Sequence, residues 1–407
     1  MKRFWPPAFV LLAAALACNS QSTAPPAAAH TAAPTVNPSE LWYRIRGGPK
    51  SDQAWSVAVD SQGNIYLGAY EQEPGEWFTD MAIYKFAPDG TQLWRTEWGN
   101  RFQEKVFIVA VAEPYLYVGG LTYTGAGLTE ADMAVLALDM ESGQVLWEFV
   151  WGQGYGYEEV DGLVVEEDAI YVSGWSVSAG GNYDIAILKL DRQGHMIWES
   201  VWGTPGFDSC DGQMVVTADS IYVSGKLNAD NVLFGGDAYV AQFSKSGGAY
   251  IRHYVYDSPL ASDGLGMTSD GETLYVVGID FIAGEGNQVL VLKLDLNLNL
   301  LWERHWGESG GEYVSRSAAV NAAGELIVAV TQRVPDNAPA DIGLVFYSPA
   351  GEVLHHTVWG GPDEEIVHGI VVSGDYLYLA GEIKYAQAPQ NDALLIKADA
   401  LSGAFPP

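Results

Sequence analysis

LWRTEWG (93–99) recurs in close variants as LWEFVWG (146–152), IWESVWG (197–203) and LWERHWG (301–307). Weaker copies are LWYRIRG (41–47), IRHYVYD (251–257) and LHHTVWG (354–360). The position of the second tryptophan is held by Arg46, Trp98, Trp151, Trp202, Tyr256, Trp306 and Trp359, with successive gaps of 52, 53, 51, 54, 50 and 53 residues. A period this regular indicates one repeated structural unit and not a series of unrelated domains.

Each unit carries four strand signals separated by turn residues. In the first complete unit they are AWSVAVD (54–60), NIYLGAY (64–70), DMAIYKF (80–86) and LWRTEWG (93–99). Asp60–Gly63 and Pro88–Gly90 supply turn residues between them. Four short antiparallel strands per repeat, with no helical periodicity, predict the blades of a β-propeller.

The ends of the repeat array predict how the ring closes. The array opens at 41–47 with a fourth strand that has no preceding three. It ends with three strands that have no fourth, EIVHGIVV (365–372), DYLYLAG (375–381) and NDALLIKAD (391–399). We therefore expect residues 41–407 to form an all-β, seven-bladed propeller of four-stranded antiparallel blades, in which strand 41–47 completes the last blade and leaves no open sheet edge.

The N-terminus reads as an export signal followed by a tether. Lys2 and Arg3 precede the apolar run 8–16, which is too short to span a membrane as a helix. Residues 15–18 (ALAC) resemble a bacterial lipobox, which implies that 1–17 is removed and that Cys18 is lipidated. Residues 18–40 are rich in Ala, Pro, Ser and Thr and predict an irregular linker. The expected location is the bacterial cell envelope, at the outer membrane or cell surface, with secretion as the alternative.

Composition excludes several classes of function. The chain has 51 acidic and 20 basic residues, a formal net charge of −31, so nucleic acid is not an expected partner. Two cysteines in 407 residues exclude a disulfide scaffold and a multi-cysteine metal module. The only membrane contact expected is the lipid anchor, and the expected state is a monomer.

The repeat resembles the bacterial propeller family often labelled SBBP. The family pattern, A-x-x-V-A-V-D-x-x-G-N-x-Y-x-x-G followed by D-A-x-x-x-K-x-D-x-x-G, is matched almost wholly within 53–90. Gln288 departs from it where six other blades carry Asp, and Ile327 departs where the others carry Tyr. The resemblance implies a secreted or surface propeller, and it assigns no shared reaction or catalytic residues.

Recurring polar and aromatic residues are predicted to be structural. The fourth-strand tryptophans and the second-strand tyrosines should pack between blades, although aromatic platforms for sugar are an alternative. Six aspartates that open third strands should cap neighbouring backbone N–H groups: Asp80, Asp132, Asp184, Asp237, Asp341 and Asp392. Six further carboxylates precede first strands and are expected to surround the channel mouth: Asp52, Glu104, Glu158, Asp208, Glu312 and Glu365.

Blades differ most at one position of the innermost strand. The candidate ligand-binding residues there are Trp55, Phe107, Asp161, Asp211, Asp263, Arg316 and His368. Asp161, Asp211 and Asp263 fall on three consecutive blades, so they are candidate ligands for Ca²⁺, or for an amine or sugar. A solvated channel with no ligand is the structural alternative.

These patterns favour a non-enzymatic binding or scaffold module for an envelope protein or an extracellular ligand such as a glycan. No catalytic residues are assigned, and no cofactor is expected apart from the candidate Ca²⁺. Two alternatives stay open: a carbohydrate-active hydrolase or lyase that uses the acidic mouth, and a purely structural component of the cell surface.

Overall fold

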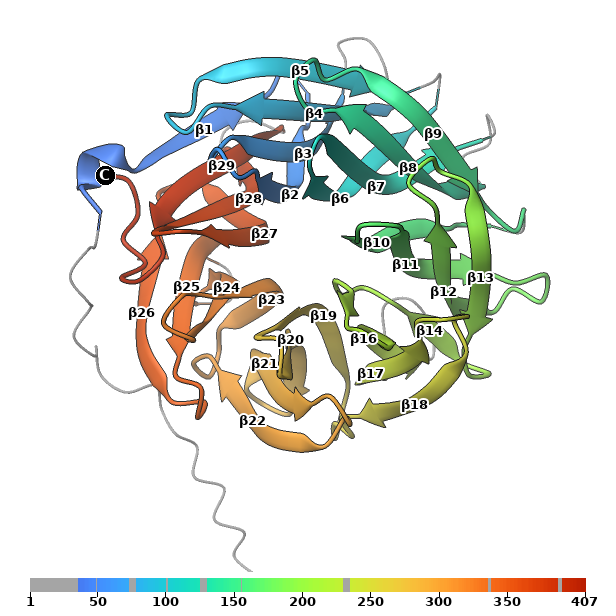
Figure 1. The fold of residues 1–407 in the computed structure, drawn as a ribbon. Coiled ribbons are helices and arrows are strands. Elements are labelled where there is room, and N and C mark those ends of the chain that lie inside the picture. Colours follow the sequence, from blue (N-terminus) through green and yellow to red (C-terminus); the bar gives the residue numbers. More distant parts are fainter. Residues whose placement is uncertain are drawn as a thin grey trace, which may run out of the picture.

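The computed structural model describes residues 36–48, 50–72, 78–99, 102–124, 130–154, 156–229, 235–335, 338–386 and 390–407. They form seven antiparallel sheets arranged in a ring around one axis (Figure 1). The protein is a seven-bladed β-propeller, as the repeat predicted. The predicted signal 1–17, Cys18 and most of the linker 18–40 lie outside the described residues.

Within each of the first three blades, the strands follow one another from the inside of the ring outward. Blade 1 contains β2 (Gln53–Val59), β3 (Ile65–Gln72), β4 (Thr79–Phe86) and β5 (Gln92–Trp98). Blade 2 contains β6 (Glu104–Ala112), β7 (Tyr115–Tyr123), β8 (Ala131–Asp139) and β9 (Val145–Trp151). Blade 3 contains β10 (Glu159–Val165), β11 (Ile170–Val177), β12 (Tyr183–Leu190) and β13 (Met196–Trp202).

Blade 4 has an interrupted first strand. It contains β14 (Phe207–Ser209), β15 (Val215–Val216), β16 (Ser220–Ala229), β17 (Asp237–Ser244) and β18 (Tyr250–Val255). Both β14 and β15 pair with β16, so together they replace one inner strand. The interruption contains Asp211, one of the predicted mouth residues.

The last three blades complete the ring. Blade 5 contains β19 (Ser262–Ser269), β20 (Thr273–Ile282), β21 (Gly286–Asp295) and β22 (Leu300–Trp306). Blade 6 contains β23 (Glu312–Val320), β24 (Leu326–Arg333), β25 (Asp341–Tyr347) and β26 (Val353–Trp359). Blade 7 contains β27 (Glu364–Ser373), β28 (Tyr376–Lys384), β29 (Asn391–Asp399) and β1 (Trp42–Arg46).

Strand β1 closes the ring in the predicted way. It pairs antiparallel with β29, with Trp42 opposite Lys397 and Arg46 opposite Ala393. Blade 7 is therefore built from both ends of the propeller domain, which lie side by side in Figure 1. The predicted closure by the N-terminal strand is confirmed.

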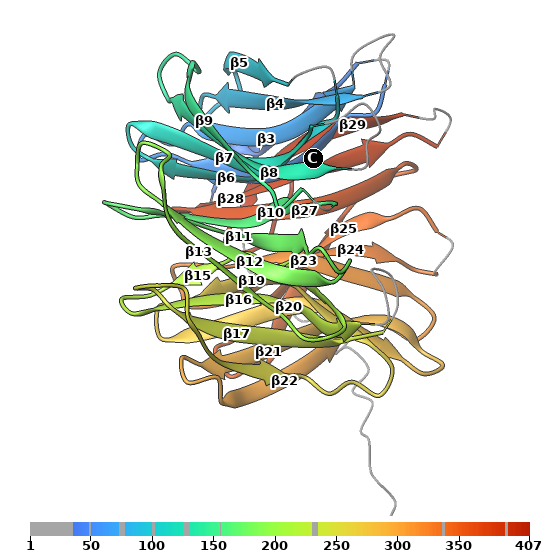
Figure 2. The same ribbon diagram turned by 90° about the vertical axis from the view of Figure 1, so that its right-hand side faces the viewer.

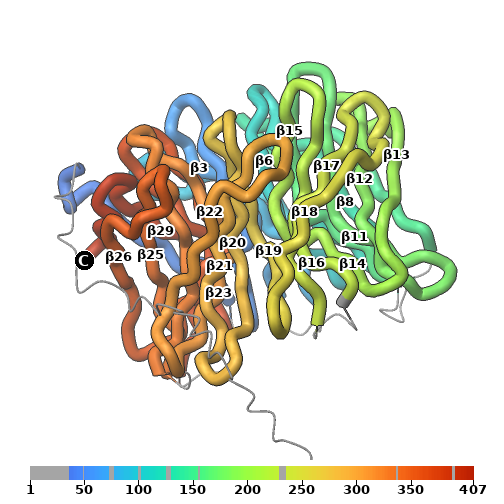
Figure 3. Tube along the Cα trace, turned by 90° about the horizontal axis from the view of Figure 1, so that it is seen from below, coloured from blue at the N-terminus to red at the C-terminus, as the bar shows by residue number. Residues whose placement is uncertain are grey.

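The ring has two distinct faces, because the strands run roughly through its thickness (Figures 2 and 3). The connections from first to second strands and from third to fourth strands are tight turns, and we call their side the turn face. The connections from second to third strands and from each blade to the next lie on the opposite side, which we call the loop face. Every first strand begins at the loop face.

The hydrophobic core is divided among the seven junctions between blades. Each of seven clusters of buried side chains combines residues of two neighbouring blades. At the first junction, Tyr66 is fully buried with its ring 6.0 Å from that of Trp94, whose Nε1 donates to the Met140 carbonyl of blade 2 at 3.2 Å. Burying an aromatic side chain of this kind contributes about 1.5–3 kcal/mol. The structural role predicted for these residues is supported.

The N-terminal segment lies on the turn face. The Val36 amide donates to the Asp399 carboxylate at 3.1 Å, and the Tyr376 hydroxyl donates to Glu40 in the short helix η1 (Pro38–Glu40). Asp399 and Tyr376 both border turns of blade 7. Among the residues that the structure describes, no helix has the length and apolar character needed to cross a membrane.

Candidate functional site

The innermost strands contain β-bulges at the predicted mouth position. The pairing of four first strands with their second strands skips one residue, which is Trp55, Phe107, Asp161 or His368. A bulge leaves its residue out of the ladder and redirects the side chain. The bulges therefore explain why this one position, and not its neighbours, reaches the axis. The sequence located the position but did not predict the bulges.

The bulged side chains meet in a cavity on the axis, which we call the axial cavity. Its volume is about 50 Å³, and it is lined by Trp55, Phe107, Asp161, Asp211, Gln213, Leu265, Arg316 and His368. Six of the seven predicted residues are thus brought together. A water molecule needs about 10–15 Å³ of such space, so the cavity has room for only a few waters. The acidic channel mouth expected from the sequence is therefore a small cavity, in which aromatic side chains and Arg316 stand beside the aspartates.

Asp263 is the predicted residue that does not line the cavity. The pairing of β19 with β20 skips Gly264 and Leu265 instead, so Leu265 takes the lining position in blade 5. Asp263 is 6% exposed, and its Oδ2 lies 3.1 Å from Lys226 Nζ. The different position of the bulge in β19, which sequence alignment of the repeats could not show, decides which side chain faces the axis.

One side of the axial cavity is aromatic. The rings of Trp55 and His368 stack at 4.2 Å with an interplanar angle of 8°, and Phe107 meets Trp55 edge-on at 5.2 Å. The Arg316 guanidinium carbon lies 6.0 Å from the centre of the Trp55 ring. Burial lowers the pKa of His368, so this imidazole is neutral at physiological pH. The Nε2 atom of His368 lies 3.6 Å from Glu382 Oε1, slightly beyond hydrogen-bond distance.

The opposite side is acidic. Burial raises the pKa of Asp161, and the neighbouring Glu159 and Asp211 raise it further. Glu159 accepts hydrogen bonds from Trp175 Nε1 at 3.0 Å and from the Tyr157 hydroxyl at 2.9 Å, and burial raises its pKa to about 7. Arg316 and Lys105 act in the opposite direction on Asp161 and Glu159, but the pKa values of both carboxyls stay raised. The crowded carboxyls therefore favour either a proton or a further positively charged group at the cavity.

The predicted calcium ligands do not form one ligand set. Asp263 is turned toward Lys226, and the Asp211 carboxylate accepts from Ser209 Oγ. Calcium takes six to eight oxygen ligands. Within the described ranges, no group of three or more His, Cys, Asp or Glu side chains is arranged to hold a metal ion. The geometry therefore does not fit the Ca²⁺ site that was a candidate from the sequence.

The carboxylates expected around the mouth are mostly inside the blade junctions. Asp52, Glu104, Glu158, Asp208 and Glu365 are all at most 4% exposed. Several lie beside the third-strand aspartate of the preceding blade and the glycine that follows the fourth strand. A Cβ atom on Gly203, for example, would lie 2.2 Å from Asp184 Oδ1 and 2.8 Å from Asp208 Oδ2. The glycine of the Trp-Gly repeat is needed to make room for this pair.

The paired junction carboxyls have raised pKa values. Burial is the main cause, and it raises the pKa of Asp52 to about 6 and those of Glu158 and Glu365 to about 7. The partner aspartates Asp392, Asp132 and Asp341 add a further upward contribution. The repeat pattern identified both the third-strand aspartates and the carboxylates that precede first strands. It could not show that members of the two sets lie side by side.

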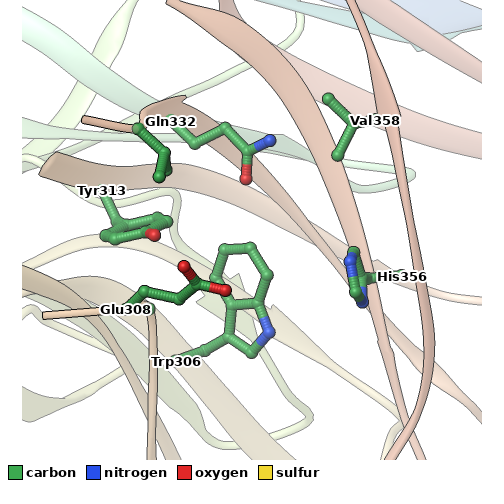
Figure 4. A pocket seen from close by; sticks show the side chains of 8 residues that line it. Trp306, Glu308, Tyr313, Gln332, His356 and Val358 are labelled. Carbon is green, nitrogen blue, oxygen red and sulfur yellow. The ribbon is translucent and has the colours of Figure 1, made fainter. Parts of the chain in front are cut away.

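A second, larger cavity lies between blades 5 and 6 and was not predicted. We call it the junction pocket (Figure 4). Its volume is about 220 Å³, and its lining consists of Trp306, Gly307, Glu308, Tyr313, Gln332, Val334, His356 and Val358. The one sequence signal near it was the departure at Gln288, because that residue replaces the aspartate found at the other junctions.

Part of the chain resembles a known outer membrane protein assembly factor. Residues 79–229 match the family described as Outer membrane protein assembly factor BamB. The match covers less than half of the chain. No curated protein matches the chain.

Solved structures share the fold at low sequence identity. The WD40 domain of Neurospora crassa Pan2 has a TM-score of 0.54 at 10% identity, over 89% of this chain and 97% of that one. The extracellular domain of a hybrid two-component system from B. thetaiotaomicron has a TM-score of 0.50 at 10% identity, over 87% of this chain. The chain spans 39% of that protein's length. These similarities show the propeller fold alone.

Proposed function

We propose that this protein is a non-enzymatic binding or scaffold module of the bacterial cell envelope, and that it recognises an envelope protein through the loop face around the axial cavity. The observation that carries the proposal is the contrast between seven similar blades and the varied side chains at one position of the innermost strand, which is a bulge in four of the blades. Bulges that redirect side chains are typical of functional positions. The BamB-like middle of the chain supports an envelope role.

The size of the axial cavity favours recognition of a surface over catalysis. A cavity of about 50 Å³ is far smaller than the roughly 300–1,000 Å³ of ordinary ligand sites. A cavity of this volume is too small for a glycosidic bond flanked by two sugars. A single side chain from a partner does fit, and the crowded carboxyls on one side favour a cationic one.

The N-terminal segment supports a particular orientation. Residues 36–40 lie on the turn face, bonded to Asp399 and Tyr376. If Cys18 is lipidated, as the lipobox predicts, the attachment to the membrane begins at the turn face. The loop face, with both cavities, is then the side farther from the attachment.

The test is cross-linking in the native membrane with the full-length, processed protein. The wild type is compared with the double variant Asp161→Asn/Asp211→Asn, which removes two carboxylates from the axial cavity. The matched control is Glu167→Gln/Asp168→Asn, which removes two exposed carboxylates from the turn face. We expect the axial variant to lose the captured protein and the control to keep it. Equal capture by all three proteins, or loss in the control alone, would overturn the proposal.

A further inference from the structure

The junction between blades 5 and 6 is built differently from the other junctions. Gln288, which is 8% exposed, stands where the other six blades have aspartate, and its side chain donates to Glu285 at 3.0 Å. The ring of Tyr313 occupies the space beside the repeat glycine instead. A Cβ atom on Gly307 would lie 2.7 Å from Tyr313 Cδ2. An aromatic ring therefore replaces the carboxyl pair, and the junction pocket opens beside it.

The junction pocket combines aromatic walls with polar groups. Figure 4 shows Trp306, Glu308 and Tyr313 on one side, His356 and Val358 on the other, and the Gln332 amide directed between them. Trp306 and Tyr313 meet edge-on, with ring centres 5.2 Å apart. At the rim, Val334 and Val358 are 48% and 46% exposed. The pocket thus offers aromatic and apolar surface together with a carboxylate, an amide and an imidazole.

A buried hydrogen-bond donor in the lining has no acceptor. Trp306 is 8% exposed, and its Nε1 makes no hydrogen bond within the described part of the chain. At equivalent positions, Trp98 Nε1 donates to Glu148 at 2.9 Å and Trp151 Nε1 donates to Glu199 at 2.7 Å, in each case across to the next blade. In blade 6 the position of these glutamate acceptors is held by His356, whose ring lies 5.9 Å from that of Trp306.

An unsatisfied buried donor is unfavourable, and native proteins rarely leave one without a reason. The indole N–H of Trp306 needs an oxygen acceptor that the protein does not supply. Because Trp306 lines the pocket, a ligand oxygen placed there would satisfy it.

We propose that the junction pocket binds a single neutral sugar ring, as the terminal or side residue of an envelope glycan. A volume of about 220 Å³ equals roughly seven water molecules, which is the scale of one pyranose ring. The aromatic and valine side chains suit the C–H faces of such a ring. Glu308, Gln332, His356 and the Trp306 indole suit its hydroxyl groups, which both donate and accept. No Lys or Arg lines the pocket, so an anionic ligand is not favoured. This site is independent of the axial cavity.

The test is saturation-transfer NMR on the full-length protein with methyl pyranosides of glucose, galactose, mannose and N-acetylglucosamine at millimolar concentration. The decisive variant is Trp306→Phe, which keeps an aromatic ring and removes the N–H. The matched control is Trp151→Phe, which makes the same change at a junction without the pocket. We expect one or more pyranosides to bind, and Trp306→Phe to weaken that binding by about three- to tenfold, the effect of one neutral hydrogen bond. Trp151→Phe should bind like the wild type.

Three results would overturn the proposal: no saturation transfer to any of the four pyranosides, equal binding by Trp306→Phe and the wild type, or equal loss in Trp151→Phe. A further arm uses a proline-rich peptide without sugar. If that peptide binds, loses binding in Trp306→Phe, and none of the pyranosides binds, the pocket is assigned to a protein ligand instead. The axial variant Asp161→Asn/Asp211→Asn should keep the sugar binding, so this result is separable from the envelope-protein test.

Discussion

Two junctions fill the space beside the repeat glycine in different ways: the junction between blades 2 and 3, and the junction between blades 5 and 6. In the first, Asp132 fills the space beside Gly152, close enough that a Cβ there would lie 1.9 Å from its Oδ1, and it raises the pKa of the neighbouring Glu158. In the second, Tyr313 fills the space beside Gly307, and a pocket of about 220 Å³ remains. The first arrangement recurs around the ring with small variations.

The difference shows how a repeat protein acquires a site. Repeated junctions are constrained by close packing, so their residues are alike and their cavities are filled. One blade can depart from the pattern while its neighbours maintain the ring. The departure at Gln288, a single residue in the sequence, marks the junction where space and an unsatisfied donor occur together.

The largest effect is expected from breaking the packing of a regular junction. Gly152→Ala places a methyl group against Asp132 Oδ1 and Cγ, at 1.9 and 2.6 Å. Overpacking of this kind costs about 1–3 kcal/mol. We expect a clear fall in the urea midpoint of unfolding.

Gly247→Ala is the matched control for this variant, because a Cβ there meets nothing within 4 Å. It should unfold at the wild-type midpoint. Equal midpoints for both variants would show that close packing between aspartate and glycine does not hold the regular junctions together.

The next effect is a dependence of stability on pH. The folded state holds protons on Asp52, Glu158 and Glu365 more tightly than the unfolded chain, because their pKa values rise to about 6, 7 and 7 from 3.8, 4.5 and 4.5. Their stabilising contribution is fully present below the unfolded pKa values and is lost as pH rises through 6 to 7. We expect the Tm to rise when the pH falls from 8.5 to 6.5.

Glu158→Gln tests the contribution of one junction carboxyl to this dependence of stability on pH. The variant should be more stable than the wild type at pH 8.5, by about 1–3 kcal/mol, and the difference should shrink at pH 6.5. Exposed Glu272→Gln is the control and should follow the wild type. Burial lowers the pKa values of His355 and His368. Their protonation therefore favours the unfolded chain, so these two histidines lower the stability below about pH 6.5. A Glu158→Gln difference that does not change with pH would contradict the carboxyl-pair explanation.

The smallest effect compares the two tryptophans. Trp151→Phe removes a hydrogen bond to Glu199 and should cost about 0.5–1.5 kcal/mol. Trp306→Phe removes a donor that has no acceptor, so its cost should come from the packing of the larger buried ring alone. Thermal melts of both variants without added sugar, alone and combined with Glu199→Ala or His356→Ala, test this. The costs should be non-additive for Trp151 with Glu199 and close to additive for Trp306 with His356. Strong non-additivity at Trp306 would mean that its indole is already satisfied in the protein.

The sequence predicted the ring well and the site only in part. The period of the Trp-Gly unit and the incomplete ends of the array were enough for seven blades and for closure by β1, because both follow from local turn and strand signals. Trp55, Asp161 and His368 were correctly aligned at one position. Asp263 was aligned with them, but the shifted bulge in β19 places Leu265 on the axis instead. A bulge depends on how two strands twist and pair, which the strand's own residues do not reveal.

The junction carboxyls show a second limit on what the sequence could predict. Asp132 and Glu158 are 26 positions apart in the sequence and belong to neighbouring blades, so only the arrangement of the ring brings them together. For the same reason the sequence placed Glu158 at a solvated mouth, whereas the structure buries it completely. Trp306 could not be distinguished from Trp98 or Trp151 without knowing what lies across the junction.

Closure by β1 also has a consequence for the order of events during synthesis. The strand at 42–46 is made early, but its partner β29 (391–399) is the last strand of the propeller to be made. Until then β1 has no partner in blade 7 and is an unpaired edge that other chains could pair with. The seventh blade can form only after residues up to β29 have been made, so a product truncated before β29 cannot close the ring.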